Sequence, residues 1–306
     1  MNTIENQTQA QLERQDQQPP TEENFAIRVI RPEELDLMEQ MEKDAHWGEL
    51  KGEDRYFYES NPESFYCYEL DGRVIGFLCG YAYSNQFGFL GNFIVDPNLR
   101  NIGCGKQLQL HVRSQMREVQ QIGADGVLEM IPLYKKWGGF ISHQVFAHLH
   151  DVQQDTPIAD EETIFDLSQV EKQQVIDYDT QIFGVDRQKV LNIMFKVPEI
   201  QTKVYIKDGC IVGFGMIRKT MSDDWHLGPL SADNQEVAQQ LFQALCNGKK
   251  GDKVIVVTEE KSHNGMELVK KFEMKQFFEA TRIYKNDERL PHNYDKIYTN
   301  MSMAFN

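Results

Sequence analysis

The heptapeptide Asp71-Gly72-Arg73-Val74-Ile75-Gly76-Phe77 recurs 137 positions later as Asp208-Gly209-Cys210-Ile211-Val212-Gly213-Phe214. At the same spacing Phe89-Leu90-Gly91 corresponds to His226-Leu227-Gly228, and Leu133-Tyr134-Lys135-Lys136-Trp137 resembles Leu268-Val269-Lys270-Lys271-Phe272 at a spacing of 135. A single Asp-Gly turn between apolar runs would indicate only a hairpin, which is a common motif. Three blocks in the same order, at a nearly constant spacing, predict two copies of one α+β unit.

The composition is that of a globular protein without membrane spans. The 306 residues suit about two domains, and 41% of them are hydrophobic. No stretch approaches the roughly 18 apolar residues that a transmembrane helix needs. A net charge of −15 would repel phosphate backbones, which argues against nucleic acid as a partner. The five cysteines are scattered without metal-ligand spacing, so we expect reduced thiols.

Two polar stretches divide the chain. Residues 1–24 contain no aromatic residue and no signal-peptide pattern, which predicts a disordered tail and a protein of the cytoplasm or nucleus. Residues 151–163 hold acidic side chains around Pro157 without any Lys or Arg, which predicts a linker. The two units are therefore expected at residues 25–150 and 164–306.

The apolar spacing predicts the elements of each unit. In the first unit a helix is expected from Pro32, with Leu35, Met38, Met41 and Ala45 on its inner face. A hairpin over 66–83, a strand over 87–95, a helix over 106–121 and a strand over 126–131 follow. In the second unit Ser168 and Glu171 predict a capping box, and Val237, Leu241 and Leu245 predict an apolar helix stripe.

The loop between the strand ending near Val95 and the next helix is rich in glycine. It reads Arg100-Asn101-Ile102-Gly103-Cys104-Gly105-Lys106. A tight loop that enters a helix directs several backbone N–H groups at one point, where the helix dipole also favours an anion. Gly103 and Gly105 would permit the required φ angles and the close approach of a ligand. We therefore expect a pyrophosphate site.

Two familiar phosphate loops do not match this spacing. A Walker A loop would require a glycine at Arg100 and a Ser or Thr at Gln107. A dinucleotide fingerprint would require a third glycine where Leu108 stands.

The pattern [Q/R]xxGx[G/A] after the strand Gly91–Pro97 resembles the GNAT superfamily of acetyl-CoA-dependent N-acetyltransferases. The resemblance covers most of residues 26–150 and includes Tyr134–Phe140, which is similar to the YxxxGF segment of that family, although Gly138-Gly139 adds one residue. It implies an α+β fold of two tandem GNAT-like domains, each with a mixed, mostly antiparallel sheet flanked by helices. It also implies that acetyl-CoA binds as the acyl donor. The pyrophosphate would lie on Arg100, Asn101, Ile102, Gly103, Cys104, Gly105 and Lys106, and the pantetheine along Phe93, Ile94 and Val95.

Three side chains are candidates for the chemistry of a direct attack by an amine on the thioester. Tyr134 matches the position of the family's general acid, although it could be a packing aromatic residue. Glu129, in the predicted strand, is the candidate base, with the alternative that it points to solvent. Asn92 could orient a water molecule. Cys104 is expected to contribute its backbone N–H and not its thiol.

Other candidate residues have equally ordinary interpretations. The resemblance to the GNAT superfamily implies an acceptor pocket near residues 46–66. Its aromatic residues could line that pocket or could belong to the core: Trp47, Tyr56, Phe57, Tyr58, Phe65 and Tyr66. His148 and His150 share a strand face but have no third ligand at a suitable spacing, so no metal site is expected. Asp186-Arg187 could clamp a substrate, or could be a helix cap beside a surface arginine. Trp225 and His226 could likewise contact a substrate or have a structural role.

The second copy lacks the residues that carry the expected chemistry. The spacing of 137 places Val237 opposite Arg100, Gln240 opposite Gly103 and Phe242 opposite Gly105, and the spacing of 135 places Val269 opposite Tyr134 and Glu273-Met274 opposite Gly138-Gly139. We therefore expect a degenerate second domain that covers or stabilises the first.

The sequence as a whole predicts an N-acetyltransferase that moves an acetyl group from acetyl-CoA to a small-molecule amine or to a lysine of a protein. The alternative is a non-catalytic acyl-CoA-binding or scaffold protein, against which Gly103, Gly105 and Tyr134 argue. The acceptor and the oligomeric state are left open.

Overall fold

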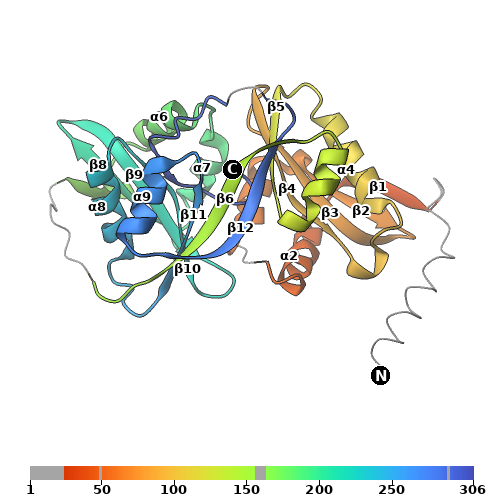
Figure 1. Ribbon diagram of the computed structural model, residues 1–306, viewed down its shortest axis with the longest axis horizontal. Helices are drawn as coiled ribbons and strands as arrows, with labels where there is room; N and C mark the ends of the chain where they lie inside the picture. Colours follow the sequence, from red (N-terminus) through yellow and green to blue (C-terminus); the bar gives the residue numbers. More distant parts are fainter. Residues whose placement is uncertain (1–23, 48–49, 156–162, 288–289) are drawn as a thin grey trace.

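Two units of similar build follow each other along the chain (Figure 1). The computed structural model describes residues 24–47, 50–155, 163–287 and 290–306, so most of the predicted tail and much of the predicted linker lie outside the described residues. The strands of the first unit are β1 (Phe25–Val29), β2 (Phe65–Leu70), β3 (Arg73–Ala82), β4 (Phe87–Val95), β5 (Gln121–Gly126) and β6 (Phe140–Asp151). Its α-helices are α2 (Leu35–Asp44), α3 (Glu53–Ser60), α4 (Cys104–Gln115) and α5 (Ile131–Lys136), and its 3-10 helices are η2 (Pro32–Glu34), η3 (Pro62–Ser64), η4 (Pro97–Leu99) and η5 (Leu128–Met130).

The second unit repeats this order. Its strands are β7 (Ile164–Asp166), β8 (Gln201–Lys207), β9 (Cys210–Lys219), β10 (Trp225–Ala232), β11 (Lys253–Glu259), β12 (Lys275–Tyr284) and β13 (Ile297–Thr299). Its helices are η6 (Leu167–Gln169), α6 (Lys172–Phe183), α7 (Gln188–Met194), α8 (Gln235–Cys246) and α9 (His263–Lys271).

The repeated blocks adopt the same backbone conformation. Asp71 and Gly72 turn the β2–β3 hairpin with φ of 49° and 76°, and Asp208 and Gly209 turn the β8–β9 hairpin with φ of 52° and 76°. Positive φ at both central residues is the two-residue hairpin turn that an Asp-Gly pair favours. The duplication predicted from these blocks is therefore confirmed at the level of backbone angles.

The ends of α5 and α9 also match. Gly139 donates its backbone N–H to Tyr134 O at 2.9 Å, and Met274 donates to Val269 O at 3.0 Å. Val269 thus stands where Tyr134 stands in the first unit, as the spacing of 135 predicts.

The two units exchange strands and share one sheet. The strands in the described residues form a 13-stranded sheet in which β12 lies between β5 and β6, and β6 lies between β12 and β11. Figure 1 shows β6 and β12 running side by side across the centre of the molecule. Each unit therefore borrows a strand from the other, a relationship that the sequence analysis did not predict.

Three expectations about element boundaries are wrong. The strand predicted over 126–131 ends at Gly126, because Pro132 lies in the first turn of α5 and the preceding residues form η5. The helix predicted over 106–121 is α4, which ends at Gln115 before β5 begins at Gln121. Ser168 does not cap α6; instead Asp166 and Gln169 form a capping box around η6.

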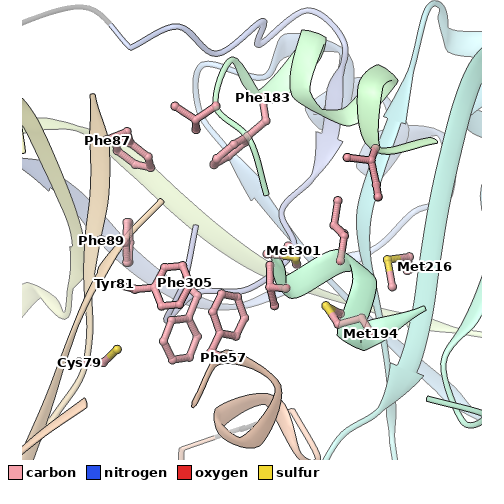
Figure 2. Close-up of a cluster of buried hydrophobic side chains, with 14 of the residues drawn as sticks. Phe57, Cys79, Tyr81, Phe87, Phe89, Phe183, Met194, Met216, Met301 and Phe305 are labelled. Atoms are coloured by element: carbon pink, nitrogen blue, oxygen red, sulfur yellow. The ribbon is translucent and has the colours of Figure 1, made fainter. Parts of the chain in front are cut away.

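The helices cover the sheet of the first unit on both faces. Leu108 and Val112 of α4 pack with Tyr68, Ile75 and Leu78 on one face. The opposite face carries a core that α2 and α3 share with α6, α7 and β9 of the second unit. Figure 2 shows this shared core, in which side chains of both units are in one cluster.

Candidate functional site

The β4 strand loses its β5 partner half-way along its length. The two strands pair in parallel from Phe87–Gln121 to Leu90–Ala124. No pairing with β5 follows, so within the described chain the edge of β4 from Gly91 to Val95 faces β5 without a strand partner. This unpaired β4 edge contains the three residues predicted to meet pantetheine, Phe93, Ile94 and Val95. It offers backbone N–H and C=O groups to an extended ligand.

The loop that follows β4 presents an anion site of backbone amides. Asn101 and Gly103 have φ of 69° and 99°, and Gly103 is the N-cap of α4 without any side-chain cap. Within the described residues, the backbone N–H groups of residues 101, 102, 103, 105 and 106 donate to no protein acceptor, and that of Cys104 contacts only its own thiol. Arg100 bonds to Val95 O through Nε at 3.1 Å, and Lys106 is exposed beside the loop. Unpaired amides at a helix N-terminus are suited to phosphate oxygens.

The two loop glycines have different structural roles. Gly103 needs its positive φ, and a Cβ there would meet nothing within 4 Å. Gly105 is helical, and a Cβ there would lie 3.2 Å from Cζ of Phe93. Gly105 therefore lets α4 lie close to β4, whereas the predicted need for a special φ applies only to Gly103.

Cys104 is buried at the start of α4. Its thiol lies against Tyr68, and burial raises the pKa of the thiol. A neutral buried thiol is a poor nucleophile. This environment fits the expectation that Cys104 contributes only its backbone.

Tyr134 lies where the unpaired β4 edge meets the end of β5. A Cβ on Gly126, the last residue of β5, would lie 2.7 Å from the Tyr134 ring. The ring also contacts Trp137, which packs against Phe93 of β4. Burial raises the pKa of the Tyr134 hydroxyl, which makes no hydrogen bond to the part of the chain that the structure describes. The hydroxyl is therefore protonated at neutral pH and available to a ligand.

The predicted base Glu129 lies on an exposed 3-10 helix. It belongs to η5 and its side chain is open to solvent, so its expected place in a strand is wrong. The apolar run around it was consistent with a strand, but Pro132 favours a helix start immediately afterwards.

Asn92 leads to a buried carboxyl group that the sequence analysis missed. Asn92 has φ of 51° at an irregular point of the β3–β4 pairing, and its Nδ2 donates to Asp54 Oδ1 at 2.5 Å. Asp54, on α3, is only 6% exposed and is hydrogen-bonded to Glu42. Burial raises the pKa of Asp54 to about 7. A carboxyl group that titrates near neutral pH beside the unpaired β4 edge can exchange a proton with a substrate.

A small pocket at the junction of the units leads to this carboxyl group. It is lined by acidic and apolar residues of the first unit and one residue of the second: Glu39, Glu42, Leu50, Gly52, Asp54 and Met221. Leu50 forms a β-bridge with Thr220, so the β9–β10 turn of the second unit is held against the pocket. The acidic lining favours a cationic ligand.

The aromatic residues considered for an acceptor pocket fall into two groups. Phe57 and Phe65 are fully buried in the shared core, and Tyr56 and Tyr58 pack against it. Tyr66 lies on the α4 side of the sheet beside His111, and Trp47 is 41% exposed. Phe57 and Phe65 are therefore core residues.

Most of the remaining ambiguous side chains make structural contacts, whereas His226 is buried with no hydrogen-bond partner in the described residues. Asp186 accepts from Gln188 N, at the first residue of α7, at 2.6 Å, and Arg187 is buried in an ion pair with Asp179. Trp225 donates to Asp252 Oδ2 at 2.7 Å. His150 packs between Phe242 and Phe272. In the described ranges no three His, Cys, Asp or Glu side chains gather into a possible metal site.

The second unit closes each of the openings found in the first. Its strands β10 and β11 pair only at Trp225–Val254 and His226–Ile255 before they separate. There β13 pairs with β10, and Asn300 N donates to Val257 O of β11 at 2.8 Å. Helix α8 is capped by the Asn234 side chain, which accepts from Val237 N at 3.1 Å. Within the described residues, the second unit therefore has neither the unpaired strand edge nor the uncapped helix start that the first unit has at β4 and α4.

The second unit has no phosphate loop because its β10–α8 connection is much shorter than the β4–α4 connection of the first unit. Eight residues, 96–103, connect β4 to α4, whereas only Asp233 and Asn234 connect β10 to α8. The constant spacing of 137 breaks at this point. The expected equivalences of Val237 with Arg100, Gln240 with Gly103 and Phe242 with Gly105 are therefore wrong, because the whole cradle is absent.

None of the helices in the described ranges is long and apolar enough to cross a membrane.

Comparisons with known proteins agree with this architecture. A family model described as Acetyltransferase (GNAT) family matches residues 34–140, and one described as Acetyltransferase (GNAT) domain matches residues 175–299. The holothin acyltransferase of Pseudoalteromonas sp. (strain SANK 73390) is 25% identical over 246 residues, which are 79% of this chain and 81% of that protein.

Solved structures show the same fold at low sequence identity. A proposed acetyltransferase from Pyrococcus horikoshii superposes with a TM-score of 0.79 at 19% identity, over 94% of this chain and 98% of its own. A tandem GNAT protein from the clavulanic acid biosynthesis pathway gives a TM-score of 0.56 at 12% identity, over 87% of this chain and 100% of its own.

These findings define an acyltransferase with the α+β fold. The chain belongs to the GNAT superfamily of acetyltransferases and holds two GNAT domains in tandem. Enzymes of this family use acyl-CoA as the donor.

Proposed function

We propose that the first unit transfers an acetyl group from acetyl-CoA to a primary amine, of a small molecule or of a lysine, by direct attack in a ternary complex. The observation that carries the proposal is the difference between the units. The β4 edge and the amide loop are open in the first unit, whereas β13 and Asn234 fill the same places in the second. One acyl-CoA per chain is the expected stoichiometry.

The donor site is assigned to the chain from Phe93 to Lys106. The amides of residues 101–106 and the charges of Arg100 and Lys106 would hold the pyrophosphate. The edge formed by Phe93, Ile94 and Val95 would pair with the amide groups of the pantetheine. An unpaired N–H of this edge can also donate to the thioester oxygen as that oxygen gains charge.

Three proton transfers accompany the reaction. The amine nitrogen bonds to the thioester carbon, the carbon–sulfur bond breaks, and the departing thiolate takes a proton from the Tyr134 hydroxyl. The proton that the nitrogen loses as it becomes an amide restores the Tyr134 hydroxyl, directly or through water. Before attack, an ammonium substrate must lose a proton. Asp54 is suited to accept it, because its pKa near 7 lets it be deprotonated under conditions where the amine is still cationic. Asn92 would orient the Asp54 carboxylate.

Glu129 remains the second candidate for the base. Its side chain is open to solvent on η5. Replacing each carboxylate separately distinguishes the two candidates.

The activity is tested by measuring free CoA thiol when acetyl-CoA is incubated with a panel of cationic amines. The proposal expects amine-dependent CoA release that Asp54→Asn lowers by about 10²-fold or more and Glu129→Gln leaves nearly unchanged. Binding of acetyl-CoA without release for any amine would support the alternative of a non-catalytic acyl-CoA-binding protein. Loss of activity in Glu129→Gln alone would move the base to Glu129.

A further inference from the structure

The segment Asn300–Asn306 crosses from the second unit to the first. It leaves β13 at Asn300, whose carbonyl oxygen would lie 1.9 Å from a Cβ on Gly228 of β10. Arg218 of β9 then donates to Met301 O at 2.6 Å and to Glu53 of α3 at 2.7 Å. Ser302 donates to the second carboxylate oxygen of Glu53 at 2.7 Å. The segment is thus fixed to both units by buried contacts.

Beyond Ser302 the segment lies against the first unit. The Ala304 carbonyl oxygen would lie 1.8 Å from a Cβ on Gly91, so this backbone is in direct contact with β4. The Phe305 ring stacks on Phe57 with 3.9 Å between centroids and also contacts Tyr81 (Figure 2). Tyr83 donates its hydroxyl to Phe305 O at 2.5 Å. Phe305 is fully buried, so its ring is held in place by the surrounding core. We call Ala304 and Phe305 together the wall.

Ala304 lies at the point along β4 where a bound donor would end. Gly91 is the first β4 residue beyond the last β4–β5 pair, Leu90 with Ala124. An extended donor held by the amides of residues 101–106 and running along β4 from Val95 would end at Gly91. Its acyl group would therefore face Ala304 and Phe305 on the side of the sheet where Asp54 lies.

We propose that Ala304 and Phe305 close the acyl end of the first unit's donor site and restrict the enzyme to short acyl groups such as acetyl. This inference rests on the proposed function. It gives the second unit a specific role, because Arg218 donates to Met301 O and Gly228 lets the Asn300 backbone lie close to β10. Selection is steric: a longer acyl chain would need the volume that the Phe305 ring occupies, and a packed core resists such an insertion.

The test compares acetyl-CoA, butanoyl-CoA and hexanoyl-CoA with the full-length chain, by calorimetric binding and by CoA release. The wild type is expected to prefer acetyl-CoA. Phe305→Ala should raise the hexanoyl-to-acetyl ratio of both affinity and kcat/KM by about tenfold or more, and Phe305→Leu by less. Phe242→Ala, which removes a buried ring from the core of the second unit, is the matched control and should leave the ratio unchanged.

The outcomes separate this inference from the proposed function. If the wild type accepts hexanoyl-CoA as well as acetyl-CoA, or if Phe305→Ala and Phe242→Ala change the ratio equally, the wall does not select the acyl group. Absence of binding for every acyl-CoA would instead contradict the donor site itself. If Phe305→Ala does not fold, the ratio for Phe305→Leu decides, and an unchanged ratio there also overturns the inference.

Discussion

Gly91 and Gly228 occupy the same place in the two units and lie beneath the same segment of chain. A Cβ on Gly91 would come within 1.8 Å of Ala304 O, and a Cβ on Gly228 within 1.9 Å of Asn300 O. Both glycines stand where a central strand loses its parallel neighbour. The segment Asn300–Asn306 therefore runs from the gap beside β10, which β13 occupies, to the gap beside β4, which is open to a donor.

Gly228→Ala is expected to destabilise the protein by roughly 1–3 kcal/mol, because the added methyl group would clash with backbone that is hydrogen-bonded to β11. Urea denaturation measures this loss. Gly209→Asn is the control, since Gly209 lies in an open turn and Asn tolerates a positive φ. An equal effect of the two substitutions would show that the contact with Asn300 carries little energy.

Activity is expected to rise with pH through about pH 7. Asp54 must be deprotonated to accept a proton, and burial raises its pKa to about 7, so kcat/KM should fall on the acid side of that value. The residual kcat/KM of Asp54→Asn should not show this decrease at acid pH. A profile that is flat from pH 6 to pH 8 would exclude Asp54 as the base.

The same carboxyl group links stability to pH. Its pKa is higher in the folded state than the ordinary value near 3.9, so the cost of burying the carboxylate is absent at low pH and grows as pH rises from about 4 through 7. The free energy of unfolding of Asp54→Asn should therefore exceed that of the wild type by at least about 1 kcal/mol at pH 8. The difference should be smaller at pH 5. Thermal melts at the two pH values test this, and a gain that does not depend on pH would contradict it.

Tyr134→Phe keeps the ring that packs against Gly126 and Trp137 but removes the hydroxyl. We expect kcat to fall by about 10²-fold while the affinity for acetyl-CoA changes little. Tyr205→Phe, in the second unit, is the control and should retain activity. Full activity of Tyr134→Phe would mean that Tyr134 only packs.

The shared sheet should make the two units unfold together. Arg282 of β12 is fully buried and pairs with Asp125 of β5 and Glu259 of β11, so one side chain joins strands of both units. Trp137 and Trp225 are fluorescence probes in the first and second units. Variants in which Trp47 and one of these two tryptophans are replaced should give coincident urea transitions. Arg282→Met should lower both midpoints, at a cost of about 3–5 kcal/mol. Two separate transitions would show that the units are independent domains.

Local signals in the sequence predicted local structure well. The Asp-Gly pairs at 71 and 208 gave the correct hairpins, the apolar run over 87–95 has the bounds of β4, and Gly103 has the positive φ that a tight loop entering a helix requires. Each depends on the conformational preference of a few neighbouring residues.

Long-range features were not predictable in the same way. The alternation in β6 does not specify that β12 will be its neighbour, because either strand of a duplicated pair offers the same edge. The contact of Asp54 with Asn92 joins α3 to an irregular point of β4, and no spacing along the chain indicates it. The loss of the second phosphate loop was predicted, but its cause, a shorter connection, appears only when the ends of β10 and α8 are known.

The presence of a single donor site, on the first unit, is tested by calorimetric titration of acetyl-CoA into the wild type, Lys106→Glu and Gln243→Glu. Lys106 lies on the first turn of α4, and Gln243 lies on α8, the helix of the second unit that corresponds to α4. We expect one site per chain, a loss of affinity of about tenfold or more in Lys106→Glu, and unchanged binding in Gln243→Glu. Two sites per chain, or weakened binding in Gln243→Glu but not in Lys106→Glu, would contradict a single donor site on the first unit.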